Sequence, residues 1–340
     1  MRHALLGTPV ILLTLISCGG GFPPRELRTP RVEAATQTPV KRMFYEDGAL
    51  NLVQAIVPHG DELLVVGNSR ICRLSRTGEL LGCQSGEADL WDLEVVADSA
   101  GAPAAIVGSG DWGRPSAAVM GLDGQVRWRY DAEYQAMGTP AIVDRDGKRV
   151  VLVQHGEKGL QAFDFETGRA VPAGEPPGHI VASEDFDGDG RRDVLAMPVR
   201  GLLWITDGGG GEVGSLRMDE PFRASVTTSA PRFVVLSLDQ RIAIHDGKLA
   251  LVKTLRAPGA EPPLHVAASA FLGSGSGAPF VAVFKGRGGW HKSIVYVFDA
   301  AGKPIYKEIL DGDFQSVAPY GQRGFLLGGR GKVLLYSFAA

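Results

Sequence analysis

The apolar positions of the chain fall into two contrasting patterns. Residues 4–16 form a nearly continuous apolar stretch behind Met-Arg-His. From about residue 50 onward, short runs of Val, Ile, Leu and Phe are separated by Gly, Asp and Pro, and no amphipathic period of 3.6 residues is sustained. Short apolar runs separated by turn-forming residues predict an all-β domain that follows a distinct N-terminal segment.

The short runs recur as a unit, which residues 141–168 show plainly. An apolar run, an Asp/Gly turn and a second run are followed by a third run, often ending in aspartate, and a fourth polar-aromatic run. The midpoints of the second runs lie 40 to 46 residues apart, at Val65, Ile106, Leu152, Leu195, Val235, Val281 and Leu326. Seven such units predict a single seven-bladed β-propeller over residues 41–340. A pair of β-sandwiches or an open solenoid is the alternative architecture.

The two ends of the repeat region complement each other. After the run 332–338 the last unit has no fourth run, whereas the strand-like run 41–45 stands upstream without a unit of its own. We expect this N-terminal strand to complete the last blade, because closing the ring removes the open sheet edges that invite aggregation.

The first 18 residues have the order of an export signal. A short positive start, an apolar stretch too short to span about 30 Å of hydrocarbon, and the small residue Ser17 precede Cys18. Leu15-Ile16-Ser17-Cys18 resembles the bacterial lipobox, and this resemblance implies cleavage before Cys18 and lipid on its thiol. An ordinary signal peptide with an incidental cysteine is the alternative.

Residues 19–40 are rich in Gly, Pro, Thr and Arg, without an apolar period. They predict a flexible tether with a random-coil reach of about 25 Å. Gly19 is not the aspartate that retains lipoproteins at the inner membrane of enteric bacteria. The lipobox resemblance therefore implies an exported protein of the cell envelope, at the outer membrane and facing the periplasm or the cell surface.

Charge and composition restrict the partners. The chain has 35 basic and 38 acidic residues, a formal net charge of −3. A mildly acidic, evenly mixed chain lacks the polybasic footprint of a nucleic-acid or anionic-lipid binder. We expect a monomer that contacts the membrane only through lipid at Cys18, with an envelope protein or a glycan as its partner.

Two further cysteines, Cys72 and Cys83, flank a turn at Thr77-Gly78. A two-residue loop there places the two thiols opposite each other on neighbouring strands. In an exported protein such a pair is a candidate disulfide. A slip of one residue would separate the thiols and leave two buried free cysteines as the alternative.

Residues 185–193 read Asp-Phe-Asp-Gly-Asp-Gly-Arg-Arg-Asp. Asp185, Asp187, Asp189 and Asp193 bring hard oxygen ligands to one short loop, to which Arg191 would add its backbone carbonyl. This spacing favours one structural Ca²⁺ ion. A solvated acidic turn without metal is the alternative.

The context of this loop differs from a helix–loop–helix site. Ala196 stands where such a site needs a bidentate glutamate, and both flanks have the pattern of strands. The loop resembles the FG-GAP or VCBS repeat of integrin α-chain propellers, and the resemblance implies that it joins the first two strands of a blade and holds calcium. The equivalent turns at 98–101, 144–147 and 273–277 keep fewer carboxylates, so we expect a single ion.

The third-run endings 121–128, 163–169 and 298–304 resemble quinoprotein-like propeller repeats. A lipid-anchored propeller of that class belongs to the outer-membrane protein assembly machinery, although that family is usually counted as eight-bladed. The sequence contains no nucleophile elbow, phosphate loop or zinc motif. We therefore expect a non-enzymatic interaction or scaffold module.

An enzyme is the alternative function. The first runs begin with polar residues or Met, at Asn51, Asp92, Met137, His179, Arg223, His265 and Gln315. His179 and His265 each lie 16 residues before a repeat midpoint, so they should hold equivalent positions on one rim of the central channel. With Arg223 they would form the centre of a glycan-active lyase or hydrolase, or of a quinone-dependent oxidoreductase. Polar residues lining a wet channel are the plainer interpretation.

Overall fold

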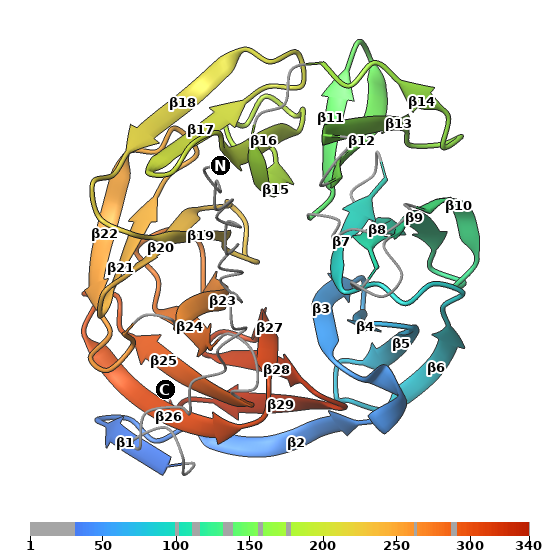
Figure 1. The fold of residues 1–340 in the computed structure, drawn as a ribbon. Helices are drawn as coiled ribbons and strands as arrows, with labels where there is room; N and C mark the ends of the chain where they lie inside the picture. The colour runs from blue at the N-terminus through green and yellow to red at the C-terminus, as the bar shows by residue number, and fades with distance from the viewer. Residues whose placement is uncertain are drawn as a thin grey trace, which may run out of the picture.

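A computed structural model of the chain describes residues 31–98, 102–110, 116–131, 139–155, 159–174, 178–261, 264–286 and 291–339. Its strands form seven antiparallel sheets arranged in a ring, with the first strand of each sheet nearest the centre (Figure 1). The prediction of an all-β, seven-bladed β-propeller is therefore confirmed.

The strands follow the chain from the centre of each blade outward. Blades one to three consist of β3 Val53–His59, β4 Glu62–Gly67, β5 Arg70–Ser75, β6 Leu80–Ser85; β7 Asp92–Ala97, β8 Pro103–Ser109, β9 Ser116–Gly121, β10 Val126–Asp131; and β11 Ala141–Arg145, β12 Lys148–His155, β13 Gly159–Asp164, β14 Ala170–Val171. Blades four to seven consist of β15 His179–Glu184, β16 Asp193–Met197, β17 Leu202–Thr206, β18 Glu212–Arg217; β19 Arg223–Val226, β20 Val234–Leu238, β21 Arg241–His245, β22 Leu251–Arg256; β23 His265–Phe271, β24 Phe280–Lys285, β25 Lys292–Phe298, β26 Pro304–Asp311; and β27 Phe314–Tyr320, β28 Gly324–Gly329, β29 Lys332–Ser337.

The second strand of each blade explains why the repeat is visible in the sequence. All seven predicted midpoints lie in second strands, from Val65 in β4 to Leu326 in β28. Every residue of β20 and of β28 is buried, because neighbouring blades cover both faces of the sheet. A strand buried on both faces appears as a continuous apolar run instead of an alternating one.

The hydrophobic core is divided among the boundaries between blades. Seven clusters of buried residues each combine side chains from two neighbouring blades. One of them joins Leu326 of blade seven to Val65 of blade one and includes Phe44 from the closing strand. The ring is thus sealed by the same apolar packing that joins every other pair of blades.

The closing strand is β2 (Val40–Glu46), which pairs antiparallel with β29 from Val40↔Ser337 to Glu46↔Lys332. The prediction that an N-terminal strand completes the last blade is confirmed. Lys41 of β2 also reaches blade six, where its Nζ lies 2.6 Å from Oε1 of Glu308. The hydroxyls of Tyr306 and Tyr336 donate to Oε2 of the same carboxylate at 2.9 and 2.7 Å.

One segment differs from expectation. Arg31–Ala35 forms β1, which pairs with β26 as a fifth strand of blade six, from Arg31↔Ile309 to Ala35↔Tyr306. The interval 19–40 is therefore not an irregular tether throughout. The physical reason is that β26 is the outermost strand of its blade, and an open edge accepts any chain with free backbone donors and acceptors, whatever its apolar pattern.

Residues 1–18 and 19–30, for which an export signal, a lipid-bearing Cys18 and a tether were predicted, lie outside the described residues. Within the described ranges, no helix has the length and apolar character needed to cross a membrane.

Cys72 of β5 lies directly opposite Cys83 of β6, and the structure joins the two sulfurs in a disulfide. The intervening turn is not the simple two-residue loop, since Leu74 pairs with Leu80 and the register shifts by one residue next to Arg73. That bulge restores the expected pairing at the cysteines.

Candidate calcium loop and channel rim

The acidic loop connects β15 to β16, the two innermost strands of blade four. Its flanks are strands, as the sequence indicated, which excludes a helix–loop–helix arrangement. Gly188 and Gly190 have φ angles of +81° and +85°, and nothing lies within 4 Å of the position that a Cβ would take. Both positions therefore favour glycine because of their positive φ angles, and not because space for a side chain is lacking.

Carboxylate oxygens of Asp185, Asp187 and Asp193 all lie within 4.8 Å of one another. The Asp185 side chain is held in place by the loop itself, because the backbone N–H groups of Gly188 and Gly190 donate to its Oδ1 and Oδ2 at 2.8 and 3.0 Å. Three carboxylates from one short loop thus meet at a single point.

Asp193 is the buried member of this set, with only 2% of its surface exposed. Burial raises the pKa of its carboxyl to about 6, and the nearby charge of Asp187 acts in the same direction, whereas the N–H of Phe186, donated at 2.9 Å, opposes the shift. Burial is the main cause of this shift, because it disfavours the ionised form of the carboxyl. Three carboxylates in one loop supply the hard oxygen donors that Ca²⁺ prefers.

Asp189, predicted as a fourth carboxylate ligand, does not join the cluster. Nε and Nη2 of Arg191 donate to its Oδ2 at 2.8 and 2.6 Å, and these bonds hold the pKa of Asp189 below its usual range. The backbone N–H and the guanidinium of Arg191 both contact Asp189, and the expected contribution of its backbone carbonyl stays a prediction. Residues two apart in an exposed turn are close enough to pair, and ligand spacing alone does not reveal this competition.

Arg192, which the sequence did not single out, ties the loop to other blades. Its guanidinium donates to the carboxylate of Glu94 in blade two and, at 2.6 Å, to the carbonyl of Ser183. Its backbone N–H donates to Oδ2 of Asp144 in blade three at 3.2 Å. Burial lowers the pKa of Arg192 to about 10, and the positive charge of Arg232 adds to the shift.

The network continues into blade five, where Arg232 Nε lies 3.1 Å from Oε1 of Glu184. Glu184 in turn lies 3.8 Å from Arg192. Arg192 and Glu184 thus connect the acidic loop to side chains of blades two, three and five.

The acidic loop follows the end of an innermost strand, whereas the predicted rim residues lie where the innermost strands begin. The structure places four of these rim residues in equivalent positions. They are the first residues of β7, β15, β19 and β23, namely Asp92, His179, Arg223 and His265. Met137 lies outside the described residues. The shared register was predictable because each residue precedes its repeat midpoint by a similar interval.

The rim is a connected polar surface. Burial raises the pKa of Asp92, against the opposing charges of Lys285 and His179. Lys285, paired with His265 in the sheet, donates to the amide oxygen of Gln315, whose own N–H group donates to Gln54. These contacts match the interpretation of polar residues that line the centre of the ring.

His179 and Arg223 line one cavity of about 1140 Å³, whereas His265 is not among its lining residues. The trio proposed for an enzymatic centre is therefore only partly brought together.

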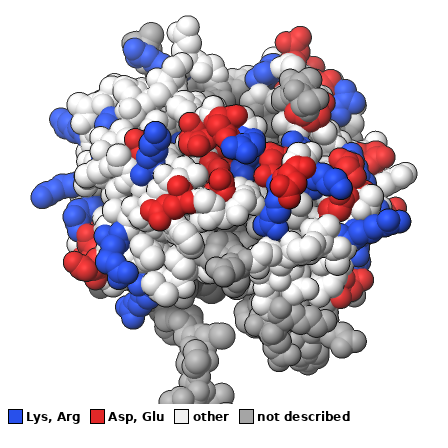
Figure 2. Space-filling model, turned by 90° about the horizontal axis from the view of Figure 1, so that it is seen from above, with Lys and Arg blue, Asp and Glu red and all other residues white. Residues whose placement is uncertain are grey.

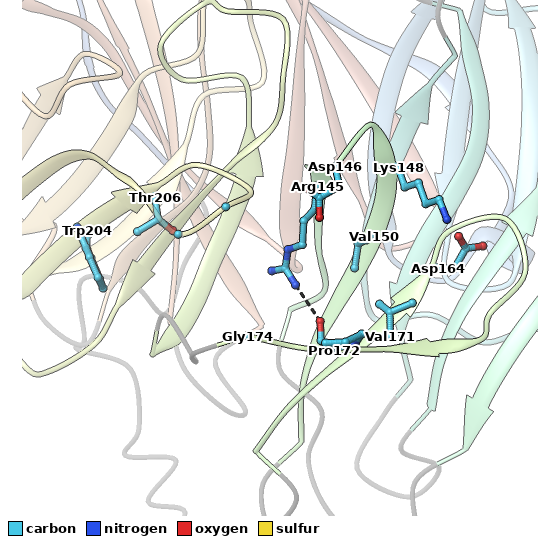
Figure 3. Close-up of a pocket in the computed structure, with 12 residues that line it drawn as sticks. Arg145, Asp146, Lys148, Val150, Asp164, Val171, Pro172, Gly174, Trp204 and Thr206 are labelled. Atoms are coloured by element: carbon cyan, nitrogen blue, oxygen red, sulfur yellow. Dashed lines mark hydrogen bonds between the residues drawn. The ribbon is translucent and has the colours of Figure 1, made fainter.

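A second cavity, of about 760 Å³, lies between blades three and four (Figure 3). Arg145 points into it, and its Nε and Nη1 donate to the carbonyls of Gly208 and Pro172 at 2.8 and 2.9 Å. Because Arg145 bonds backbone atoms of both blades, we interpret this space as part of the joint between them.

Charge is distributed without a dominant patch on the face drawn in Figure 2, where Lys and Arg side chains lie beside Asp and Glu. This agrees with the mixed composition of the chain. It offers no broad basic surface of the type that binds a polyanion non-specifically.

The ring of seven blades defines the chain as a β-propeller. It is similar to Raptor from Chaetomium thermophilum, with a TM-score of 0.57 and 15% identity over 91% of this chain and 30% of that chain. It is also similar to the Pan2 WD40 domain of Neurospora crassa, with a TM-score of 0.54 and 11% identity over 91% of this chain and 98% of that domain. At these identities the likeness shows the fold alone.

The chain covers less than two thirds of the Raptor chain that it matches. No protein-family model matches this sequence. No curated protein matches it either.

Proposed function

We propose that the chain is an exported, lipid-anchored β-propeller that binds one calcium ion and serves as a non-enzymatic interaction module at the cell envelope. The observation that carries this proposal is the meeting of Asp185, Asp187 and Asp193 in a loop between the two innermost strands of blade four. This is the place that the loop has in the FG-GAP and VCBS repeats it resembles.

The proposed role of the ion is structural. Asp185, Asp187 and Asp193 would hold it, and its positive charge would offset the repulsion among their carboxylates. Arg192 follows this loop and contacts Glu94, and Asp144 receives its backbone N–H. A calcium-ordered loop would therefore restrict motion of the innermost strands, and a rigid ring would present its binding surface in one conformation.

The proposed anchor is lipid on Cys18, supported by the lipobox resemblance of residues 15–18. Only the interval 19–30 separates Cys18 from β1, so the two lie at most about 45 Å apart along a fully extended chain. A short connection of this kind keeps the propeller close to the membrane. The mixed surface charge adds little attraction to anionic lipid, so the lipid itself would supply the attachment.

The interaction role is favoured over an enzyme by the arrangement of the rim. Of the three residues considered for catalysis, His179 and Arg223 share a cavity and His265 lies outside its lining. Propellers often act by presenting a constant face to a partner, here an envelope protein or a glycan.

Removing calcium is expected to lower the melting temperature of the full chain by about 5 °C. An ion that binds only the folded state at a hundred times its Kd contributes about 2.7 kcal/mol, and each kcal/mol shifts the melting of a domain of this size by about 2 °C. The measurement is thermal melting of calcium-loaded protein before and after EGTA, followed by calcium again.

Asp187→Asn is the control, because its melting should not respond to EGTA. An unchanged melting temperature after chelation of a sample verified to contain calcium would contradict the proposed site.

A further inference from the structure

The cavity beside the rim forms a groove over blade four. Its lining begins with His179 and Arg223 at the innermost strands, continues through the turn 197–201 and ends at 217–222, beyond the outermost strand β18. Figure 1 shows β15 to β18 in this order from the centre of the ring outward. Since neighbouring strands lie about 4.8 Å apart, the groove is roughly 15 Å long.

The lining of this groove carries more positive than negative charge. Arg200, Arg217 and Arg223 line it, and none of their guanidinium groups has an ion pair or hydrogen bond with another described residue. Asp219, which shares the lining, offsets one of these three charges, whereas Glu220 is engaged at 2.7 Å by Arg241, outside the groove. On a chain whose net charge is negative, this local excess of cations needs an explanation.

The rest of the lining is largely apolar. Met197, Met218 and Phe222 take part in it together with two prolines. Methionine side chains adapt to apolar groups of different shape. Gln154 also belongs to the lining, and its Oε1, which is shielded from solvent, accepts no hydrogen bond from any described group. The groove thus offers cations and adaptable apolar contacts.

We propose that this groove is the docking site for an acidic peptide segment of a partner protein. Carboxylates of the segment would pair with the guanidinium groups, and its apolar side chains would pack on the methionines and Phe222. At about 3.3 Å per residue, an extended segment of roughly five residues fills the groove. A single aromatic ring favours a peptide over a glycan, which is held largely by stacking on aromatic faces.

This inference rests on the proposed interaction role, for which it names a class of partner. Its test uses the full chain in detergent solution and a fluorescein-labelled peptide with alternating Glu and Leu, followed by fluorescence polarisation. The peptide is expected to bind, and a Lys/Leu peptide of equal length is not. Arg217→Ala and Arg223→Ala should each weaken binding about tenfold, the lower range for a charge-assisted hydrogen bond.

Arg169→Ala is the matched control, because Arg169 is an exposed arginine that precedes β14 in blade three and does not line the groove. It should bind the peptide as the unaltered chain does. Thermal melting verifies that each variant is folded. Affinity should also fall with added salt, since solvent-accessible ion pairs are screened.

Three outcomes would overturn the docking site: no binding of the acidic peptide, equal binding by folded Arg223→Ala, or binding of oligogalacturonate in place of the peptide. None of these depends on Cys18 or on the calcium loop. Loss of the docking site would therefore leave the anchored, calcium-binding propeller standing, and failure of the anchor would leave the peptide result valid.

Discussion

Cys18→Ser is expected to abolish lipid attachment, so that incorporation of an alkyne-labelled fatty acid falls to background. The thiol is the atom that the lipobox resemblance assigns to diacylglycerol, and serine lacks it. Cleavage before residue 18 should fail as well, because in lipobox proteins it follows the lipid transfer. The measurement is labelling of growing cells, with the mass of the isolated protein to distinguish precursor from mature chain.

The double variant Cys72→Ser/Cys83→Ser is the control, since it removes the disulfide and leaves the proposed anchor intact. It should label as strongly as the unaltered chain. Fatty-acid labelling of Cys18→Ser at the level of the unaltered chain would show that Cys18 is not the lipid site. Loss of the lipid should greatly weaken membrane binding, because each buried methylene of an acyl chain contributes about 0.8 kcal/mol to it.

Glu308→Ala is expected to lower the free energy of unfolding by about 3–5 kcal/mol, a large part of the stability of a typical domain. Its carboxylate accepts from Lys41 of the closing strand and from the buried hydroxyls of Tyr306 and Tyr336. Burial and the charge of Glu308 raise the pKa of both tyrosines, so both remain donors. Removing the acceptor leaves these groups unpaired where the ring closes.

Urea denaturation of the full chain measures this effect. Glu308→Gln, which keeps the shape and one carbonyl acceptor, should cost less than Glu308→Ala. Tyr336→Phe should cost about 1.5–3 kcal/mol, the usual value of a hydrogen bond to a charged group. If the free energy of unfolding of Glu308→Ala lies within about 1 kcal/mol of that of the unaltered chain, the carboxylate does not stabilise the ring closure.

The number of blades and the closing strand were predictable because second strands buried on both faces leave an apolar signature at a regular interval. Val234–Leu238 of β20 is such a strand. The strand Arg31–Ala35 left no such signature, because pairing at an outer edge is made by backbone groups and does not require apolar side chains. The irregular composition of residues 19–40 was therefore misleading for those five residues.

The acidic loop was visible in the sequence because its carboxylates lie within nine residues of one another. The sequence did not show which of these carboxylates converge. Asp189 pairs with Arg191 instead of joining the other carboxylates, and this choice depends on side-chain geometry. Arg192 and Glu94 are 98 residues apart, and only the ring brings them together. The same holds for the groove, where the pairing of β17 with β18 brings Arg200 towards Arg217, and Arg223 joins them from β19 of blade five.

Calorimetric titration of Ca²⁺ into the metal-free full chain shows whether the loop from Asp185 to Asp193 is a calcium site. One ion should bind per chain, and this binding should be lost in Asp187→Asn, which removes one charged ligand while keeping the size of the side chain. A titration without saturable binding, or one in which Asp187→Asn takes up the ion as well as the unaltered chain, would contradict a calcium site in this loop.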